Sequence, residues 1–145
     1  MAHTRYLFDT NIVTAHRLAA LDKKFQMSAV VLSELMTATE PEEYDVYRAL
    51  WLGGERDGRL IVPTAEDWLP AARILHLLAQ DRKKKAKGKS PRRTPTAKQE
   101  LVMDVLIAVS AAREGVTVVT NDSDFEAIRY YHKKLMIKSG GEFFQ

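Results

Sequence analysis

The chain contains no cysteine, which excludes disulfide bonds and metal sites built from thiolates. It also lacks the G-x-G-x-x-G and Walker glycine motifs that hold the phosphates of nucleotide cofactors. The four histidines are His3, His16, His76 and His132, and only His16 lies near one of the acidic motifs described below. The residues that remain for metal or acid chemistry are therefore the carboxylates.

Long apolar runs are also absent, since no stretch approaches the ~18 residues of a membrane span. No charged and then apolar leader opens the chain. With 46% hydrophobic and 28% charged residues among 145, the composition is that of an ordinary globular protein. We expect a cytoplasmic protein in which residues 1–145 form a single domain with one core.

Short apolar runs alternate with helical patterns throughout the chain. The runs predict strands at 5–9, 24–28, 59–63, 116–120 and 134–138. The helical patterns cover 12–22, 29–38, 41–58, 64–81 and 96–115, with Thr96 as the cap of the last helix. Such alternation favours right-handed crossovers, so we expect an α/β fold: a three-layer α/β/α arrangement around a mostly parallel central sheet.

Four carboxylates interrupt the most apolar segments: Asp9, Glu34, Asp104 and Asp122. An ionised carboxylate removed from water costs several kcal/mol, a large part of the ~5–15 kcal/mol that stabilises a domain. No Lys or Arg lies beside any of these acids in its segment. A bound divalent cation would compensate their charge, and Mg²⁺ prefers oxygen ligands.

The predicted elements bring at least two of these acids to one place. Asp9 and Asp122 both follow predicted strands, and ligands gather at the carboxyl ends of strands in open parallel sheets. Glu34 lies early in a helix that starts where a strand ends, although a cap or a surface ion pair would also explain an acid there. Asp104 is surrounded by apolar residues of its helix and should face inward or toward a cleft.

The ordered motifs resemble those of a known family. D-T-N follows the first strand, S-x-V-V-L-S-E-L lies on a helix, M-D-V-L-I-A lies on a buried helix, and T-N-D-x-D-F follows a strand. In this order and at these separations they resemble the PIN-domain ribonucleases, particularly the VapC-like toxins of type II toxin–antitoxin pairs. The resemblance implies a PIN-like fold and an endoribonuclease that hydrolyses RNA with a metal-activated water.

The resemblance also implies roles for particular residues. The acids Asp9, Glu34, Asp104 and Asp122 would bind Mg²⁺ or Mn²⁺, and Asp124 would support them or bind a second ion. Only one residue separates Asp122 from Asp124, whereas the corresponding gap is longer in some members of the family. Which of the two is the direct ligand is therefore open. The polar residues that would orient the acids or contact the substrate are Thr10, Asn11, Thr120 and Asn121. The implied partners are an RNA substrate, a cognate antitoxin and a second copy of the chain in a homodimer.

Positive charge is concentrated in one segment. Residues 82–93 hold eight of the 22 Lys and Arg and no acid, which leaves 14 basic against 19 acidic residues elsewhere. We expect an exposed basic loop at about 82–95. Its cations could hold an RNA backbone, through Lys83, Lys84, Lys85, Arg92 and Arg93. The alternative is a loop that only keeps the protein soluble.

Other function classes fit less well. A haloacid-dehalogenase-type phosphotransferase requires D-x-D after the first strand, and Asn11 stands where the second acid would be. A receiver-type signalling domain requires an Asp on its third strand, and the run at 59–63 has none. A catalytically inactive PIN-like module that binds RNA or regulates is the remaining alternative, and the retained acids argue against it.

Overall fold

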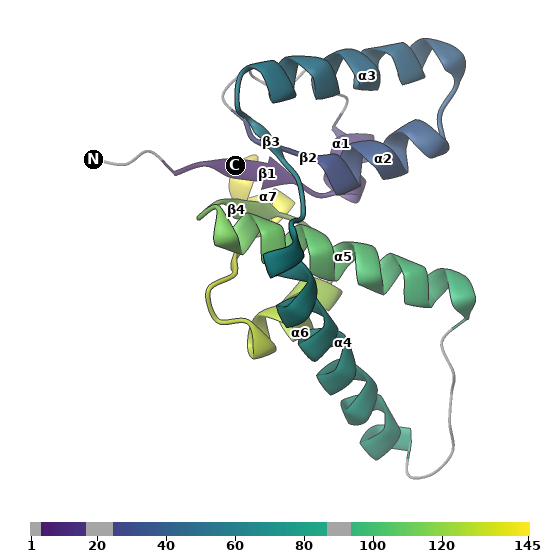
Figure 1. Cartoon of the computed structure of the whole chain (residues 1–145), viewed down its shortest axis with the longest axis vertical. Helices are drawn as coiled ribbons and strands as arrows, with labels where there is room; N and C mark the ends of the chain where they lie inside the picture. Colours follow the sequence, from purple (N-terminus) through teal and green to yellow (C-terminus); the bar gives the residue numbers. More distant parts are fainter. Residues whose placement is uncertain (1–3, 17–24, 87–93) are drawn as a thin grey trace.

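A computed structural model describes residues 4–16, 25–86 and 94–145 (Figure 1). Its strands are β1 (Tyr6–Phe8), β2 (Met27–Ser28), β3 (Leu60–Ile61), β4 (Thr117–Val119) and β5 (Met136–Lys138). All pairings are parallel: β1, β4 and β5 form one sheet, and β2 pairs with β3. A single parallel bridge between Leu7 and Gln26 joins the two sheets, which gives the strand order β3-β2-β1-β4-β5. Each strand lies within the range that the sequence predicts.

The helices are α1 (Thr10–Ala15), α2 (Ala29–Thr37), α3 (Pro41–Arg56), α4 (Ala65–Ala86), α5 (Pro95–Arg113), α6 (Asp124–Tyr131) and α7 (Gly140–Phe143). Helices α2 to α5 form where the sequence predicts helices, although the boundaries of α4 and α5 differ from the prediction. Helix α1 begins two residues earlier than predicted, and residues 17–22 of that prediction lie outside the described residues. Helices α6 and α7 were not predicted. Within the described ranges, no helix is both long enough and apolar enough to cross a membrane.

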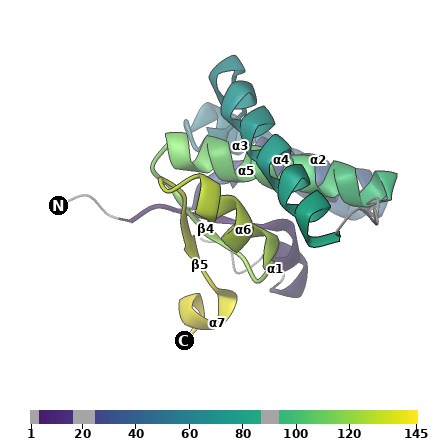
Figure 2. The ribbon, with the colours of Figure 1, turned by 90° about the horizontal axis from the view of Figure 1, so that it is seen from below.

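The helices form two groups around the strands. Figure 1 shows α2 and α3 as a hairpin beside β2 and β3, and α4, α5 and α6 together on the other side of β1 and β4. Contacts join α4, α5 and α6 to one another, and α2 contacts α1, α3 and α5. Figure 2 shows α7 at the far end of β5, away from α4 and α5. The predicted α/β/α fold with a mostly parallel sheet is confirmed.

Helix α5 is the central helix of the core. Its residues from Val105 to Ala111 are all buried, and Val105, Ile107 and Ala108 are fully so. Its first turns are exposed instead, so the helix extends from the core into solvent at its N-terminal end. Asp104 is half-buried and lies at the boundary between these two halves.

Two predicted boundaries are wrong. Helix α4 continues to Ala86, so residues 82–86 are helical and not part of an exposed loop. Lys, Arg and Ala are good helix formers, and cations in a last turn stabilise the negative end of the helix dipole. Helix α5 is capped by Thr94, whose Oγ1 accepts the Ala97 N–H at 3.1 Å, and not by Thr96. Pro95 then occupies the first helical position, which suits its fixed φ.

The strand order reverses direction at the centre of the sheet. From β1 the chain proceeds outward through β2 and β3, and it then returns to β4 on the opposite side of β1. The connections that leave the carboxyl ends of β1 and β4 therefore run to opposite sides, which opens a crevice between them. Asp9 follows β1 and Asp122 follows β4 closely, so both lie at this crevice.

Candidate metal centre

Asp9 is held by the elements on both sides of the crevice. Its Oδ1 accepts the Thr10 N–H at 2.8 Å and so caps α1, while its Oδ2 accepts the Thr120 hydroxyl at 2.8 Å. The Asp9 N–H donates to the Val119 carbonyl at 3.0 Å, which extends the β1–β4 ladder. Asp9 is 4% exposed, and burial raises the pKa of its carboxyl group. Both of its oxygens are thus already oriented.

Thr120 connects Asp9 to the second group of acids. Its Oγ1, besides donating to Asp9, accepts the Asp122 N–H at 3.0 Å. Asp122 in turn accepts the Asp124 N–H through Oδ1 at 2.9 Å. This chain of hydrogen bonds fixes the turn between β4 and α6, where the T-N-D-x-D-F motif lies. The position of Asp9 and the conformation of this turn therefore depend on the same hydroxyl group.

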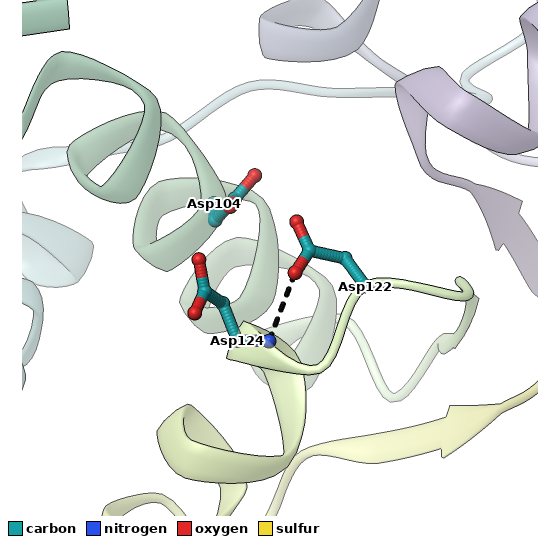
Figure 3. A group of neighbouring side chains, drawn as sticks. All are labelled: Asp104, Asp122 and Asp124. Carbon is teal, nitrogen blue, oxygen red and sulfur yellow. Dashed lines mark hydrogen bonds between the residues drawn. The ribbon is translucent and has the colours of Figure 1, made fainter. Parts of the chain in front are cut away.

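Asp104, Asp122 and Asp124 converge. Each offers a carboxylate oxygen, and the three oxygens all lie within 4.8 Å of one another. Figure 3 shows Asp104 extending from α5 toward Asp122 and Asp124 at the start of α6. Asp122 and Asp124 both lie close to Asp104, so either of them could contact an ion that Asp104 binds. Asp9 and Glu34 are outside this close group but act on it electrostatically, since the charges of both raise the pKa of Asp104.

The acids destabilise one another's ionised forms. Burial first, and then the charges of Asp9 and Asp122, raise the pKa of Asp104 to about 8. Burial and the charge of Asp9 raise the pKa of Glu34 to about 7. Among the described residues, no Lys or Arg contributes to these shifts. The absence of compensating cations, inferred from the sequence, holds in three dimensions for this part of the chain.

Within the described part of the chain, two buried oxygen atoms at the site have no hydrogen-bond partner: Glu34 Oε1 and Thr10 Oγ1. The Thr10 hydroxyl lies near the Glu34 carboxyl group but makes no hydrogen bond of normal geometry to it. A buried carboxylate oxygen without a partner is costly unless something else coordinates it. Every atom that these residues offer to a metal ion is a carboxylate or hydroxyl oxygen. The residues therefore fit a hard divalent cation such as Mg²⁺ or Mn²⁺.

Comparison with known proteins identifies the family to which the chain belongs. A family profile described as the PIN domain matches residues 6–130. The chain belongs to the PIN domain family. No curated protein matches the chain.

Solved structures share the fold of this PIN domain at low identity. VapBC-5 from Mycobacterium tuberculosis is 20% identical with a TM-score of 0.53, over 94% of this chain and 98% of that chain. VapBC-1 from nontypeable Haemophilus influenzae is 21% identical with a TM-score of 0.50, over the same shares. FitAB bound to an IR36 DNA fragment is 17% identical with a TM-score of 0.55, over 92% and 94%.

The polar residues predicted to assist the acids divide into two pairs in this PIN domain. Thr10 and Thr120 lie among the acids, as described above. Asn11 is exposed on α1, and Asn121 is exposed with its Oδ1 accepting the Gly140 N–H at 2.9 Å. The Asn121 side chain therefore binds the backbone at the start of α7.

Three of the predicted RNA-binding residues are on a different helix from the acids. Lys83, Lys84 and Lys85 are exposed at the end of α4, while Arg92 and Arg93 lie outside the described residues. Figure 1 shows α4 and α5 diverging as they leave the sheet. Since α5 begins at Pro95, Asp104 lies nine residues, or about 14 Å, from the start of that helix.

Sequence reasoning overlooked one acid at the edge of the site. Glu100 is exposed on α5, and its charge contributes to the raised pKa of Glu34. Glu100 and Asp104 are four residues apart, which places them on one face of the helix. This spacing of four residues could have indicated from the sequence that Glu100 lies near the site. With Glu34 and Gln99, Glu100 lines a cleft of about 290 Å³ between α2 and α5.

Proposed function

We propose that this PIN domain is a metal-dependent endoribonuclease that acts in the cytoplasm. Asp9, Glu34, Asp104, Asp122 and Asp124 would hold Mg²⁺ or Mn²⁺. The observation that carries the proposal is the convergence of acids from separate elements with no compensating cation among the described residues, together with the unpartnered Glu34 Oε1. Clusters of like charge that destabilise a fold are typical of functional sites.

The residues of the site have separable tasks in this proposal. A bound divalent cation would lower the pKa of a water molecule and neutralise charge that grows on the phosphate during phosphodiester hydrolysis. Asp104 and Glu34, whose pKa values are about 8 and 7 in the metal-free protein, would release protons as they become ligands. Thr120 would keep the Asp9 carboxylate oriented through its hydrogen bond.

Two clefts include residues of the acid cluster in their lining and could receive an RNA strand. One is the cleft between α2 and α5 that contains Glu34 and Glu100. The other, of about 400 Å³, borders Asp122, and its lining contains the cations Arg129 and Lys138 as well as the acids Glu126 and Glu142. Cations beside a divalent-ion site suit the phosphates that flank a scissile bond. An RNA that crosses the acids could occupy both clefts.

The exposed lysines at the end of α4 would add contacts to the RNA backbone farther from the site. Lys83, Lys84 and Lys85, with Arg92 and Arg93, make up the basic segment that the sequence singles out. These cations would strengthen binding without touching the reacting atoms. Their removal should therefore affect affinity more than the chemical step.

We also propose that the protein is the toxin of a toxin–antitoxin pair, and that an antitoxin covers the groove between α2 and α3. This apolar groove of about 450 Å³ is lined by Met36, Tyr44, Trp51 and Leu52, among others. It shares Ser33 and Thr37 with the acidic cleft, so the two are continuous. An apolar segment in the groove could extend a basic side chain to Glu34. Solved VapBC and FitAB complexes share the fold.

The proposed homodimer would bury apolar residues of α4. Trp68 is 54% exposed and Leu69 is 79% exposed on this helix. Exposed large apolar side chains at adjacent positions are typical of interaction surfaces. Sedimentation of the purified protein at tens of micromolar would test this, and a monomer at that concentration would contradict it.

The nuclease proposal is tested by incubating total cellular RNA with the protein, with and without Mn²⁺, and mapping the cut ends. We expect cleavage that requires metal and that leaves 5′-phosphates, and we expect Asp104→Asn to reduce it by at least about 100-fold. Asp45→Asn is the matched control, because Asp45 is an exposed acid on α3. Cleavage in excess chelator, or undiminished cleavage by Asp104→Asn, would contradict the proposal. RNA binding without cleavage would indicate an inactive RNA-binding module.

A further inference from the structure

Helix α7 lies beyond residues 6–130, the part of the chain that the PIN family profile matches. It follows β5 directly, and the Thr120 N–H donates to the Lys138 carbonyl at 3.0 Å, so the β4–β5 ladder leads to the acid-bearing turn. Ser139 caps the helix by accepting the Glu142 N–H at 3.1 Å. The start of α7 is thus placed beside the turn that carries Asp122.

Gly140 connects α7 to the turn that carries Asp122. It is buried, and its N–H donates to Asn121 Oδ1 at 2.9 Å. A Cβ atom at this position would lie 2.9 Å from Ile12 Cδ1 and 3.0 Å from Asn121 Nδ2. Gly140 therefore touches both α1, which Asp9 caps, and the turn between Thr120 and Asp122. A side chain at this position would require the end of the Ile12 side chain or the Asn121 amide to shift.

Aromatic contacts fix the other end of α7. The Phe143 ring packs edge-on against Tyr6 and Phe8, with centroid distances of 5.0 and 5.2 Å. The Phe144 ring stacks on His16 at 4.0 Å. These contacts join α7 to β1 and to the end of α1, the two elements that flank Asp9. Helix α7 therefore packs against the segment that carries Asp9, from β1 to α1, and also contacts the segment that carries Asp122, the turn after β4. We call these the two acid-bearing segments.

We propose that α7 is a clamp that holds the two acid-bearing segments in register, and that Asn121 is the positioning residue through which it acts on the metal ligands. Asn121 lies between Thr120, which binds Asp9, and Asp122. Its hydrogen bond to Gly140 restrains the backbone of both neighbours. The inference rests on the proposed metal site and assigns Asn121 to ligand geometry and not to RNA contact.

The test compares the same substitution at adjacent positions of α7. Gly140→Ala would push against both the Asn121 amide and Ile12 Cδ1, whereas among the described residues a Cβ at Gly141 meets only Ser139 Oγ at 3.9 Å. Titration calorimetry with Mn²⁺ on the full chain should show about tenfold weaker binding for Gly140→Ala, the lower end of the effect of removing a residue that orients a ligand. Gly141→Ala should bind Mn²⁺ as the original protein does.

A double-mutant cycle separates positioning from general loosening of the fold. Asn121→Ala should weaken Mn²⁺ binding by a similar factor, and Gly140→Ala should add little in that background, because both changes remove one contact. Additive effects, or an unchanged Kd in Gly140→Ala, would overturn the clamp. If Gly140→Ala does not fold, Asn121→Ala decides alone: unchanged Mn²⁺ binding overturns the proposal. If the original protein binds no Mn²⁺, the proposed function fails first.

Discussion

At the scale of single residues, Asp104 and Glu34 make the metal-free site sensitive to pH. Their pKa values of about 8 and 7 exceed the ordinary values of 3.8 and 4.5, chiefly because burial disfavours the ionised forms. At neutral pH the folded protein therefore binds more protons than the unfolded chain does. The contribution of these two groups to the free energy of unfolding therefore decreases as pH rises from about 4 to about 8.

We expect chelator-treated protein to melt at a lower temperature at pH 8.5 than at pH 5. Asp104→Asn should remove much of this dependence and raise the melting temperature at pH 8.5 by about 5 °C, the effect of roughly 2 kcal/mol in a chain of this size. Mn²⁺ should stabilise the original protein more at pH 8.5 than at pH 5, because protons compete for the same oxygens. Scanning calorimetry measures all three effects. A melting temperature that is independent of pH without metal would contradict the prediction.

At the scale of elements, the pairing of α4 with α5 depends on one buried acid. Asp67 is 2% exposed at the start of α4. Arg113, in the last turn of α5, donates from Nε to Asp67 Oδ1 at 2.9 Å and from a terminal nitrogen to the Val62 carbonyl at 3.1 Å. Asp67 Oδ2 also accepts the Thr64 N–H at 2.8 Å. This ion pair ties the sheet-side ends of the two helices together.

Removing one partner of this ion pair should lower the stability of the folded protein. Arg113→Met would leave the Asp67 carboxylate buried without its cation, which we expect to lower the free energy of unfolding by about 3 kcal/mol. Adding Asp67→Asn to Arg113→Met should recover part of that stability, because no buried charge then remains uncompensated. Urea denaturation measures both variants. A decrease below about 1 kcal/mol in Arg113→Met would show that the pair is not important for stability.

The basic end of α4 gives a prediction about RNA binding. Replacing Lys83, Lys84 and Lys85 with Ser should raise KM more than it lowers kcat, because these side chains lie away from the acids. The slope of log affinity against log salt should fall by about 0.7 for each phosphate of a single strand that the variant no longer neutralises. Adding Arg92→Ser and Arg93→Ser should extend both effects. Fluorescence anisotropy with a labelled RNA measures the slope.

An exposed cation of α3 provides the control for that experiment. Arg56 is exposed on a helix that does not carry any of the proposed ligands, and it does not line the groove between α2 and α3. Replacing it with Ser should leave RNA affinity and its salt slope nearly unchanged. If the α4 variant behaves like this control, the basic segment only aids solubility, and the cleft that contains Arg129 and Lys138 becomes the stronger candidate for the RNA surface.

At the scale of the whole molecule, the sequence predicted the strands and the conspicuous acids because local patterns determine both. Asp9, Asp104 and Asp122 interrupt apolar runs, and such interruptions are visible without a structure. The strand order was not predicted, because pairing depends on contacts between distant segments. The bond from Thr120 to Asp9 spans 111 positions and has no local signature.

Other features were missed because their local signals were weak or ambiguous. Helix α6 follows an acidic turn whose residues resemble a loop, and α7 is only four residues long. Thr96 is as plausible a cap of α5 as Thr94, because the two threonines flank Pro95 and only the helical position of the proline decides between them. Glu100 was missed because it lies on an exposed turn, where an acid needs no explanation.

The reversal of strand order has a consequence for when the site can exist during synthesis. Asp9 and Glu34 are made early, whereas Asp104, Asp122 and Asp124 follow about seventy residues or more after Glu34. Since β1 pairs directly with β4, the ribosome must release most of the chain before the acids can meet. The Gly140 contact with Asn121 forms later still. A nascent chain that stops before residue 124 would therefore carry only part of the acid cluster, and the proposed nuclease would stay inactive until its later segments emerged.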